Sequence, residues 1–333
     1  MSTTQEPVPT GGVLNPEPAT QPGVGERTGH PPFALTILGA GSATPTLRFH
    51  PTAQLLTVGP DYMLIDCGEG TQFRLIEQKI RPGRLRYIFI SHLHGDHYFG
   101  LAPLLSTLNL GGRTEELYLF GPRGLDEVLT TMFRVSDSRL GYPLHFQAVD
   151  PHTPARLLDH PLITVESIPL QHRIDCTGYL FREKPHRPHL LRERLPDDVP
   201  VAYLKQLKDG EDILGADGQI LYAAADYTTP GPKPRAYAFC SDTRYAEALV
   251  PQVRGVDLLY HEATFLDDNE PRAAEVYHST ARQAATIAAK AEVGRLLLGH
   301  FSSRYKQFDG FLTESRAVFP RTDLAVEGQT LAI

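Results

Sequence analysis

The chain has few cysteines and no long apolar run, and both absences limit the class of protein it belongs to. Its 333 residues contain three single cysteines, Cys67, Cys176 and Cys240, which is typical of a reduced intracellular protein rather than a disulfide framework. No apolar run approaches the roughly 20 residues that span a bilayer. The N-terminus lacks the cationic stretch and apolar core of a secretory signal. The sequence therefore predicts a cytoplasmic protein with no membrane segment.

An excess of positive charge is also missing. The 32 Lys/Arg and 39 Asp/Glu residues give a formal net charge of −7, whereas a protein whose whole surface binds nucleic acid is usually basic. Any contact with nucleic acid must therefore come from a local cationic patch or from bound metal ions. Hydrophobic residues at 41% and charged residues at 21% are ordinary for a soluble globular chain.

Residues 1–32 differ from the rest of the chain, because they hold seven prolines and five glycines and few large apolar residues. This composition predicts a disordered leader, followed by one folded unit over 33–333. In that unit strands and helices alternate, and polar residues collect just after strand ends, where active sites of open α/β sheets lie. We expect strands at 34–38, 53–58, 62–65, 87–90, 117–120, 163–169, 178–181, 236–240, 258–260 and 295–298, and helices at 71–78, 99–110, 125–133 and 280–291.

The segment ISHLHGDH at 90–97 places His92, His94, Asp96 and His97 directly after an apolar strand. Imidazole nitrogen and carboxylate oxygen suit zinc, and also manganese or iron. In a loop, the first two histidines converge on one ion, and Asp96 and His97 point towards a second ion close by. A chance histidine cluster on a solvated loop is the alternative, but the position after a strand favours a metal site.

Three more polar residues follow apolar strands, namely His172, Asp242 and His300. Taken singly, each is read more simply as a hydrogen-bonded structural residue. Taken with the first loop, they complete two coordination shells that would otherwise be weak. A carboxylate has two oxygens, so Asp242 is the natural bridge between two ions.

The ordered motifs resemble those of ribonuclease Z from about residue 34 to the C-terminus. The segments that carry the resemblance are DCGEGTQ at 66–72, SHLHGDH at 91–97, LQHR at 170–173, SDTR at 241–244, HEATF at 261–265, HST at 278–280 and GHFSSRY at 299–305. The SHLHGDH segment alone is typical of the wider metallo-β-lactamase superfamily. The other segments together point to a much narrower group of proteins.

The resemblance implies an α/β fold, a four-layer αβ/βα sandwich, with two zinc ions per subunit and manganese as an alternative. It assigns one ion to His92, His94 and His172, the other to Asp96, His97 and His300, and the bridge to Asp242. Asp66 would steady the ligand loop, unless it is an ordinary turn residue at a strand end.

The implied activity is that of an endoribonuclease that removes the 3′ trailer from precursor tRNA, leaving a 3′ hydroxyl on the tRNA and a 5′ phosphate on the trailer. Asp96 would orient or deprotonate the attacking water, and His278 would protonate the leaving oxygen, with a structural place before the 280–291 helix as the alternative. Glu262 would orient His278 or pair with an arginine. Ser302, Ser303 and Arg304 would bind phosphate, or form a solvated loop.

About seventy residues separate His172 from Asp242, and ribonuclease Z enzymes carry a flexible tRNA-binding arm in this region. We expect the arm at about 180–205. Over 182–208, seven Lys/Arg, among them Lys184 and Arg187, face the four acids Glu183, Glu193, Asp197 and Asp198, which leaves a local charge of +3. A mobile surface excursion is the alternative. The family also implies a homodimer.

Two segments depart from the family pattern. The stretch PTLRFH at 45–50 lacks the lysine and asparagine of a family loop linked to the cleavage position relative to CCA, and 198–205 lacks the Gly-Pro-rich element of the arm. Another hydrolase of the same superfamily (a phosphodiesterase, lactonase or thioesterase) would share the ligands without needing the arm. A non-catalytic RNA-binding scaffold is a further alternative, against which the complete ligand set argues.

Overall fold

The structure, a computed structural model, describes residues 32–196 and 198–333. The leader expected at 1–32 lies outside this part except for Pro32, and so does Asp197 of the expected arm. Within the described ranges, every helix is too short or too polar to span a bilayer.

Two seven-stranded sheets make up the centre of the folded unit. The first has the order β18-β1-β2-β3-β4-β5-β6, and the second has the order β17-β16-β15-β14-β9-β8-β7. The strands of the first sheet are β1 (Phe33–Gly39), β2 (Ala53–Val58), β3 (Asp61–Ile65), β4 (Leu85–Phe89), β5 (Leu117–Gly121), β6 (Leu144–Ala148) and β18 (Thr330–Ala332). Those of the second are β7 (Arg156–Asp159), β8 (Ile163–Pro169), β9 (Thr177–Glu183), β14 (Ala236–Cys240), β15 (Leu258–Glu262), β16 (Arg295–Gly299) and β17 (Thr322–Leu324).

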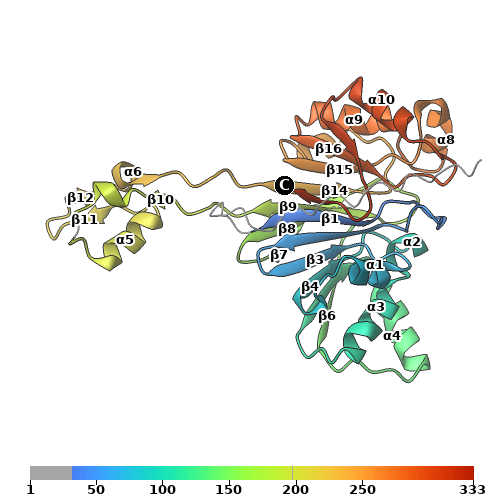
Figure 1. The fold of residues 1–333 in the computed structure, drawn as a ribbon, viewed down its shortest axis with the longest axis horizontal. Helices are drawn as coiled ribbons and strands as arrows, with labels where there is room; N and C mark the ends of the chain where they lie inside the picture. The colour runs from blue at the N-terminus through green and yellow to red at the C-terminus, as the bar shows by residue number, and fades with distance from the viewer. Residues whose placement is uncertain (1–31, 197) are drawn as a thin grey trace, which may run out of the picture. The chain divides into compact units, whose positions relative to one another are not determined.

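The sheets pack face to face through an aromatic core that includes Phe89 and Phe120 of the first sheet and Phe181 and Phe239 of the second. The rings of Phe89 and Phe181 meet edge to face at 5.4 Å between centroids. The outer face of the first sheet is covered by α1 (Thr71–Glu77), α3 (Leu101–Leu110) and α4 (Leu125–Val135), and that of the second by α7 (Leu249–Gln252), α9 (Ala281–Lys290) and α10 (Asp309–Arg316) (Figure 1). This order of layers confirms the predicted four-layer αβ/βα sandwich.

Every strand and helix expected from the sequence is present, with ends shifted by a few residues. Among the strands of the two sheets, the expectation omitted β6, β7, β17 and β18, which are the four edge strands. They are three to five residues long, and β6 and β7 have no fully buried residue. Short, half-exposed edge strands carry little hydrophobic periodicity for a sequence to show.

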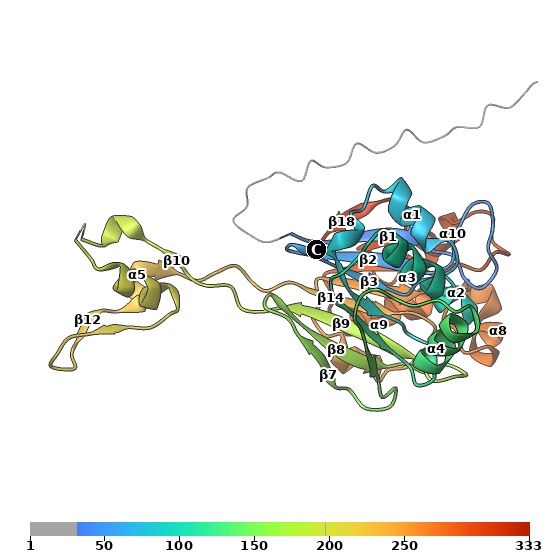
Figure 2. The ribbon, with the colours of Figure 1, turned by 90° about the horizontal axis from the view of Figure 1, so that it is seen from below.

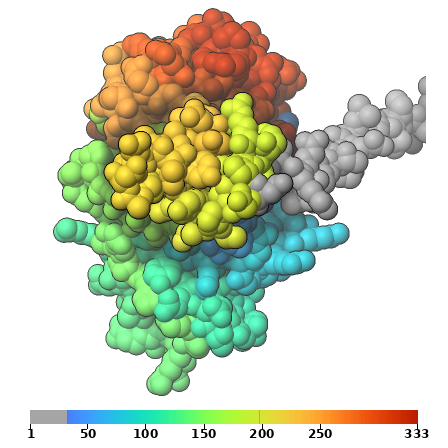
Figure 3. Space-filling view, turned by 90° about the vertical axis from the view of Figure 1, so that its left-hand side faces the viewer, coloured from blue at the N-terminus to red at the C-terminus, as the bar shows by residue number. Residues whose placement is uncertain are grey.

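The segment inserted between β9 and β14, 184–235, which we call the arm, extends beyond the expected range of about 180–205. Residues up to Glu183 belong to β9, and the chain returns to the second sheet only at Ala236. Between them lie β10 (His189–Leu190), α5 (Val201–Lys208), β11 (Ile213–Leu214), β12 (Ile220–Tyr222), α6 (Ala224–Tyr227) and β13 (Thr228–Thr229). The small core of the arm, Leu195, Val199, Leu207, Ile213 and Ala224, needs residues well beyond 205. Figure 2 shows these elements grouped apart from the sheets, and Figure 3 shows them in yellow as one compact group of atoms.

Candidate metal centre

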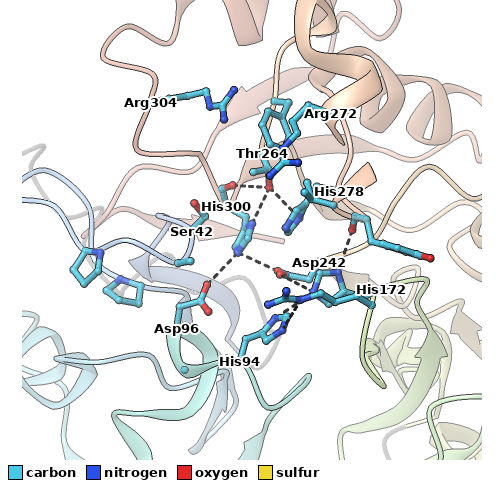
Figure 4. A pocket seen from close by; sticks show the side chains of 18 of the residues that line it. Ser42, His94, Asp96, His172, Asp242, Thr264, Arg272, His278, His300 and Arg304 are labelled. Atoms are coloured by element: carbon cyan, nitrogen blue, oxygen red, sulfur yellow. Dashed lines mark hydrogen bonds and ion pairs between the residues drawn. The ribbon is translucent and has the colours of Figure 1, made fainter. Parts of the chain in front are cut away.

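Parallel strands of the two sheets end at one edge of the sandwich, and the loops that follow them carry the polar residues. Strands β3 and β4 run parallel in the first sheet, as do β14, β15 and β16 in the second. The short helix α2 (Gly95–Tyr98) begins inside the loop after β4 and turns Asp96 and His97 inward. The structure thereby brings together all seven expected ligands, His92, His94, Asp96, His97, His172, Asp242 and His300, several of which Figure 4 shows pointing towards one another.

The first ligand set consists of three imidazoles and one carboxylate oxygen. The Nδ1 atom of His94 lies 2.9 Å from Nε2 of His92 and 3.2 Å from Nε2 of His172. Asp242 Oδ2 lies 3.6 Å and 3.7 Å from the same two Nε2 atoms. Four ligands bound tetrahedrally to zinc at 2.0–2.1 Å would be about 3.4 Å apart, so this set has the right spacing.

The protonation of these imidazoles also suits a cation. Burial lowers the pKa of His92 and His172, and it lowers that of His94 to about 4. The three rings are therefore neutral near pH 7, and each keeps a lone pair for a metal ion.

The second ligand set has the same spacing. His97 Nε2 lies 3.3 Å from Asp96 Oδ2 and 3.2 Å from Asp242 Oδ1, and His300 Nε2 lies 3.4 Å and 3.0 Å from these oxygens. Both Nε2 atoms are buried without a hydrogen-bond partner among the described residues. Such orphaned atoms are costly unless a ligand satisfies them, so the donor set fits a divalent metal ion. Asp242 supplies one oxygen to each set.

Asp66 fixes the loop at 91–97, which carries four of the candidate ligands, through three hydrogen bonds. It is fully buried at the end of β3, and its Oδ1 accepts the backbone N–H of Ser91 at 2.7 Å. Its Oδ2 accepts the Ser91 hydroxyl at 2.9 Å and the Nδ1–H of His97 at 2.7 Å. A proton fixed on Nδ1 leaves Nε2 of His97 as the ligand atom. Asp66 has φ 56, a left-handed conformation that aspartate tolerates better than most residues.

We expect Asp66→Ala to weaken metal binding by about 10- to 100-fold, because His97 loses the partner that orients it. Three buried donors would also lose their acceptor, at a cost of about 3–5 kcal/mol in unfolding free energy. Metal content after dialysis against metal buffers, and denaturant unfolding, measure the two effects. Asp159→Ala, which removes an exposed partner of Lys184, is the control, and equal metal affinity in both variants would contradict the assignment.

Two other ligands are oriented by groups that the sequence analysis did not single out. The Nδ1–H of His172 donates to the backbone carbonyl of Tyr277 at 3.1 Å. The Nδ1–H of His300 donates to the hydroxyl of Thr264 at 2.9 Å, and that hydroxyl donates to Glu262 Oε2 at 2.7 Å. Thr264 belongs to the HEATF motif, so the sequence offered a signal for its role. The carbonyl of Tyr277 offers no such signal, because every residue has a backbone carbonyl.

Glu262 also accepts hydrogen bonds from the two loops beside it. Its Oε1 lies 2.9 Å from the backbone N of Thr243, next to Asp242, and 2.7 Å from Nδ1 of His278. Burial alone would lower the pKa of the His278 imidazole, but the Glu262 carboxylate outweighs burial and raises that pKa to about 9. Of the two partners expected for Glu262, the structure places His278 at its carboxylate, and no arginine pairs with it among the described residues.

A cleft of about 730 Å³ opens over the ligands. Arg304, expected from the sequence, lines it together with Arg173 and with Arg272 of α8 (Glu270–Glu275), which were not foreseen. The Arg304 guanidinium lies over the Phe265 ring at 4.9 Å. The structure does not bring the other expected substrate-binding residues, Ser302, Ser303, Lys184 and Arg187, into this cleft.

The two arm cations instead pair with acids close to them. The ammonium of Lys184 lies 2.6 Å from Asp159, and Nε of Arg187 lies 3.1 Å from Asp209 at the end of α5. Their predicted contact with substrate stays a prediction.

Comparisons of the sequence with known families and proteins agree with this geometry. The model of the Beta-lactamase superfamily domain matches residues 228–301, and that of the Anti-Pycsar protein Apyc1 matches residues 33–135. Ribonuclease Z of Cytophaga hutchinsonii is 46% identical over 301 residues, which cover 90% of this chain and 96% of that protein. Ribonuclease Z of Bacteroides fragilis is 45% identical over 302 residues, which cover 90% and 99%.

Solved structures show the same architecture. Human tRNase Z, short form, superposes with a TM-score of 0.65 at 25% identity over 90% of this chain and 99% of that chain. The metallo-beta-lactamase fold protein YhfI from Bacillus subtilis gives a TM-score of 0.64 at 20% identity, also over 90% and 99%. The latter likeness shows the fold alone.

Proposed function

The chain belongs to the ribonuclease Z family and is an endoribonuclease that processes the 3′ end of precursor tRNA; we propose that it does so with two zinc ions per subunit. The observation that supports this proposal most directly is the position of Asp242 between the two ligand sets. Each of its two carboxylate oxygens faces one set, at 3.0–3.7 Å from the histidine Nε2 atoms. Sets rich in imidazole favour zinc, and manganese is the alternative.

Bound at these sets, the cations would lower the pKa of a water molecule and neutralise charge on the phosphoryl oxygens. Asp96 turns Oδ2 towards His97 and His300, so that Oδ1 is left to orient the water or take its proton. We propose in-line attack of this water on phosphorus, after which the ribose 3′ oxygen leaves. The tRNA then ends in a 3′ hydroxyl and the trailer begins with a 5′ phosphate.

His278 would supply the proton that the leaving oxygen needs. Its Nδ1–H donates to Glu262 at 2.7 Å, and its ring lines the cleft beside His300, with 5.4 Å between the ring centroids. The Nε2 atom is then the free ring nitrogen, and as an imidazolium it carries a proton towards the substrate.

The RNA would be held by cations outside the ligand sets. Arg304 lies at the rim of the cleft (Figure 4), where its guanidinium suits a phosphate. The arm carries Lys184 and Arg187, and we propose that it binds the body of the tRNA. Ser302 and Ser303, next to Arg304 but outside the cleft, would contact RNA that continues past the rim.

The enzyme is further proposed to act in the cytoplasm as a homodimer. A small apolar pocket between α1 and α3 is lined by Leu75, Ile76, Ile80, Leu104 and Leu108, and the side chains of Ile76 and of Phe73, also in α1, are exposed. Exposed apolar surface of this kind suits a second copy of the chain. Light scattering in solution measures the mass of the particle, and the mass of a single chain would contradict the dimer.

Cleavage of an end-labelled precursor tRNA, with and without a chelator, tests the activity and the metals together. We expect cutting at or near the discriminator base, a new 3′ hydroxyl, loss of activity after chelation and recovery with zinc. Two bound metals without any cutting of precursor tRNA would contradict the proposal. Small phosphodiester, lactone and thioester substrates would then separate the other hydrolases of this fold.

A further inference from the structure

The arm leaves and rejoins the second sheet at a pair of opposite charges. Glu183 is the last residue of β9, and Arg235 immediately precedes β14, the antiparallel neighbour of β9. The Arg235 guanidinium donates from Nε to Glu183 Oε2 at 2.8 Å and from Nη2 to Oε1 at 2.6 Å. The backbone N–H of Arg235 also donates to Oε2 at 2.8 Å. One carboxylate thus holds both the side chain and the backbone of the returning segment.

Glu183 of this pair is buried and Arg235 is half-buried, in contrast to exposed pairs such as that of Arg254 with Glu292. The Glu183 side chain is 4% exposed and that of Arg235 is 26% exposed. Burial alone would raise the pKa of the Glu183 carboxyl, but the hydrogen bonds and charge of Arg235 outweigh it and hold that pKa below its usual value. A bidentate pair whose carboxylate is shielded from water fixes geometry better than an exposed pair with a single contact does.

The same pair connects the arm to the ends of the first sheet. The Arg235 guanidinium lies 5.3 Å from the centre of the Phe33 ring, at the start of β1, and donates to the backbone oxygen of Ile333 at 3.1 Å. On the arm side, Nε2 of His186 lies 3.3 Å from Glu183 Oε2. The base of the arm is therefore tied to both sheets.

A second contact lies a few residues further along the arm. A Cβ atom at Gly231 would come within 2.6 Å of the His186 carbonyl oxygen and 2.8 Å of that of Arg187. The departing and returning segments therefore touch backbone to backbone, which leaves no room for a side chain. Two contacts in succession fix the direction of the arm, whereas a single contact would allow the arm to rotate about that point.

We propose that the Glu183–Arg235 pair positions the arm, setting the direction in which it leaves the sheet and thereby the affinity for tRNA rather than the chemical step. The inference rests on the proposed function of the arm in RNA binding. A small rotation at the base displaces the distant β11–β12 end by much more, and misplaced binding groups lose affinity for a large substrate. A small phosphodiester that contacts only the metal centre does not sense the arm.

Arg235→Met tests the proposal. The substitution keeps an apolar side chain near Phe33 but removes the positive charge and the two hydrogen bonds of the guanidinium to Glu183. We expect KM for precursor tRNA to rise at least about tenfold, with kcat within about twofold and kcat/KM for bis(p-nitrophenyl) phosphate unchanged. Arg235→Lys, which keeps the charge but cannot form the bidentate contact, should give an intermediate KM. Arg254→Met, which breaks the exposed pair with Glu292, is the matched control and should match the wild type.

Glu183→Gln provides an independent variant should Arg235→Met fail to fold, because the amide keeps the shape and one acceptor. An unchanged KM for precursor tRNA in the folded variants would overturn the positioning role alone. A parallel loss on both substrates would overturn it too, since that result means a general structural defect. A wild-type enzyme that cleaves the small phosphodiester but not precursor tRNA would instead overturn the proposed function, and the inference with it.

Discussion

Asp242→Ala is expected to lower kcat/KM for precursor tRNA by more than about 1000-fold, because the proposed reaction depends on charge stabilisation by two bound cations. Asp242 gives Oδ2 to the set of His92 and His172 and Oδ1 to the set of His97 and His300. Its loss leaves the first set with neutral imidazoles only and the second with Asp96 as its one anion. Metal affinity depends on deprotonated, charged ligands, so both ions should bind more weakly.

Metal content by mass spectrometry, together with single-turnover cleavage, measures this effect. Asp242→Asn provides the sharper comparison, because it keeps the size of the buried side chain and removes only its charge and one acceptor oxygen. Asp323→Ala, which removes a partly exposed partner of Arg295, is the control for folding. A variant at position 242 that retains two metals and cleaves at the wild-type rate would refute the bridging assignment.

The clustering of the candidate ligands and of Asp66 was predictable from the sequence, because each follows an apolar strand and belongs to a short polar motif. Asp66 after β3, Asp242 after β14 and His300 after β16 all have positive φ values, 56, 56 and 58 respectively. Each therefore sits in a tight turn where a buried strand ends, and the apolar runs before these turns were visible in the sequence. Parallel pairing of the strands then brings the turns together.

The groups that orient the ligands were less visible. Thr264 reaches His300 across 36 residues of chain, and Tyr277 contributes a backbone carbonyl that any residue would have. Tyr277 itself has φ 61, an uncommon conformation for a bulky residue, and its carbonyl is directed at His172. Such contacts depend on how loops fold back, which local patterns do not encode.

The candidate substrate-binding cations show a similar limit. Counting charges along 182–208 selected Lys184 and Arg187, but the structure pairs them with Asp159 and Asp209. Arg173 and Arg272, from segments that no charge count marked, line the cleft instead. Linear charge density predicts that a segment is cationic, but the direction of each side chain is set by acids that lie far away in sequence.

His278→Ala is expected to lower kcat for precursor tRNA by about 100- to 10,000-fold while leaving both metals bound. The imidazole belongs to neither four-ligand set described above, and its Nδ1 is committed to Glu262 at 2.7 Å. It does lie close enough to Asp242 and His300 to be a ligand in its own right. A fall in metal content with the fall in rate would therefore support that other reading and contradict the acid role.

The leaving group separates proton donation from every other effect of this substitution. A ribose 3′ oxygen needs a proton to depart, whereas p-nitrophenolate leaves readily as an anion. The loss caused by His278→Ala should therefore shrink to less than about tenfold with bis(p-nitrophenyl) phosphate. Loss of a phosphate-binding group would depress both substrates equally, as would distortion of the metal centre. His145→Ala, at a half-exposed ring that pairs with Glu116, should affect neither substrate. The ratio of the two losses thus identifies His278 as the acid independently of how far either rate falls.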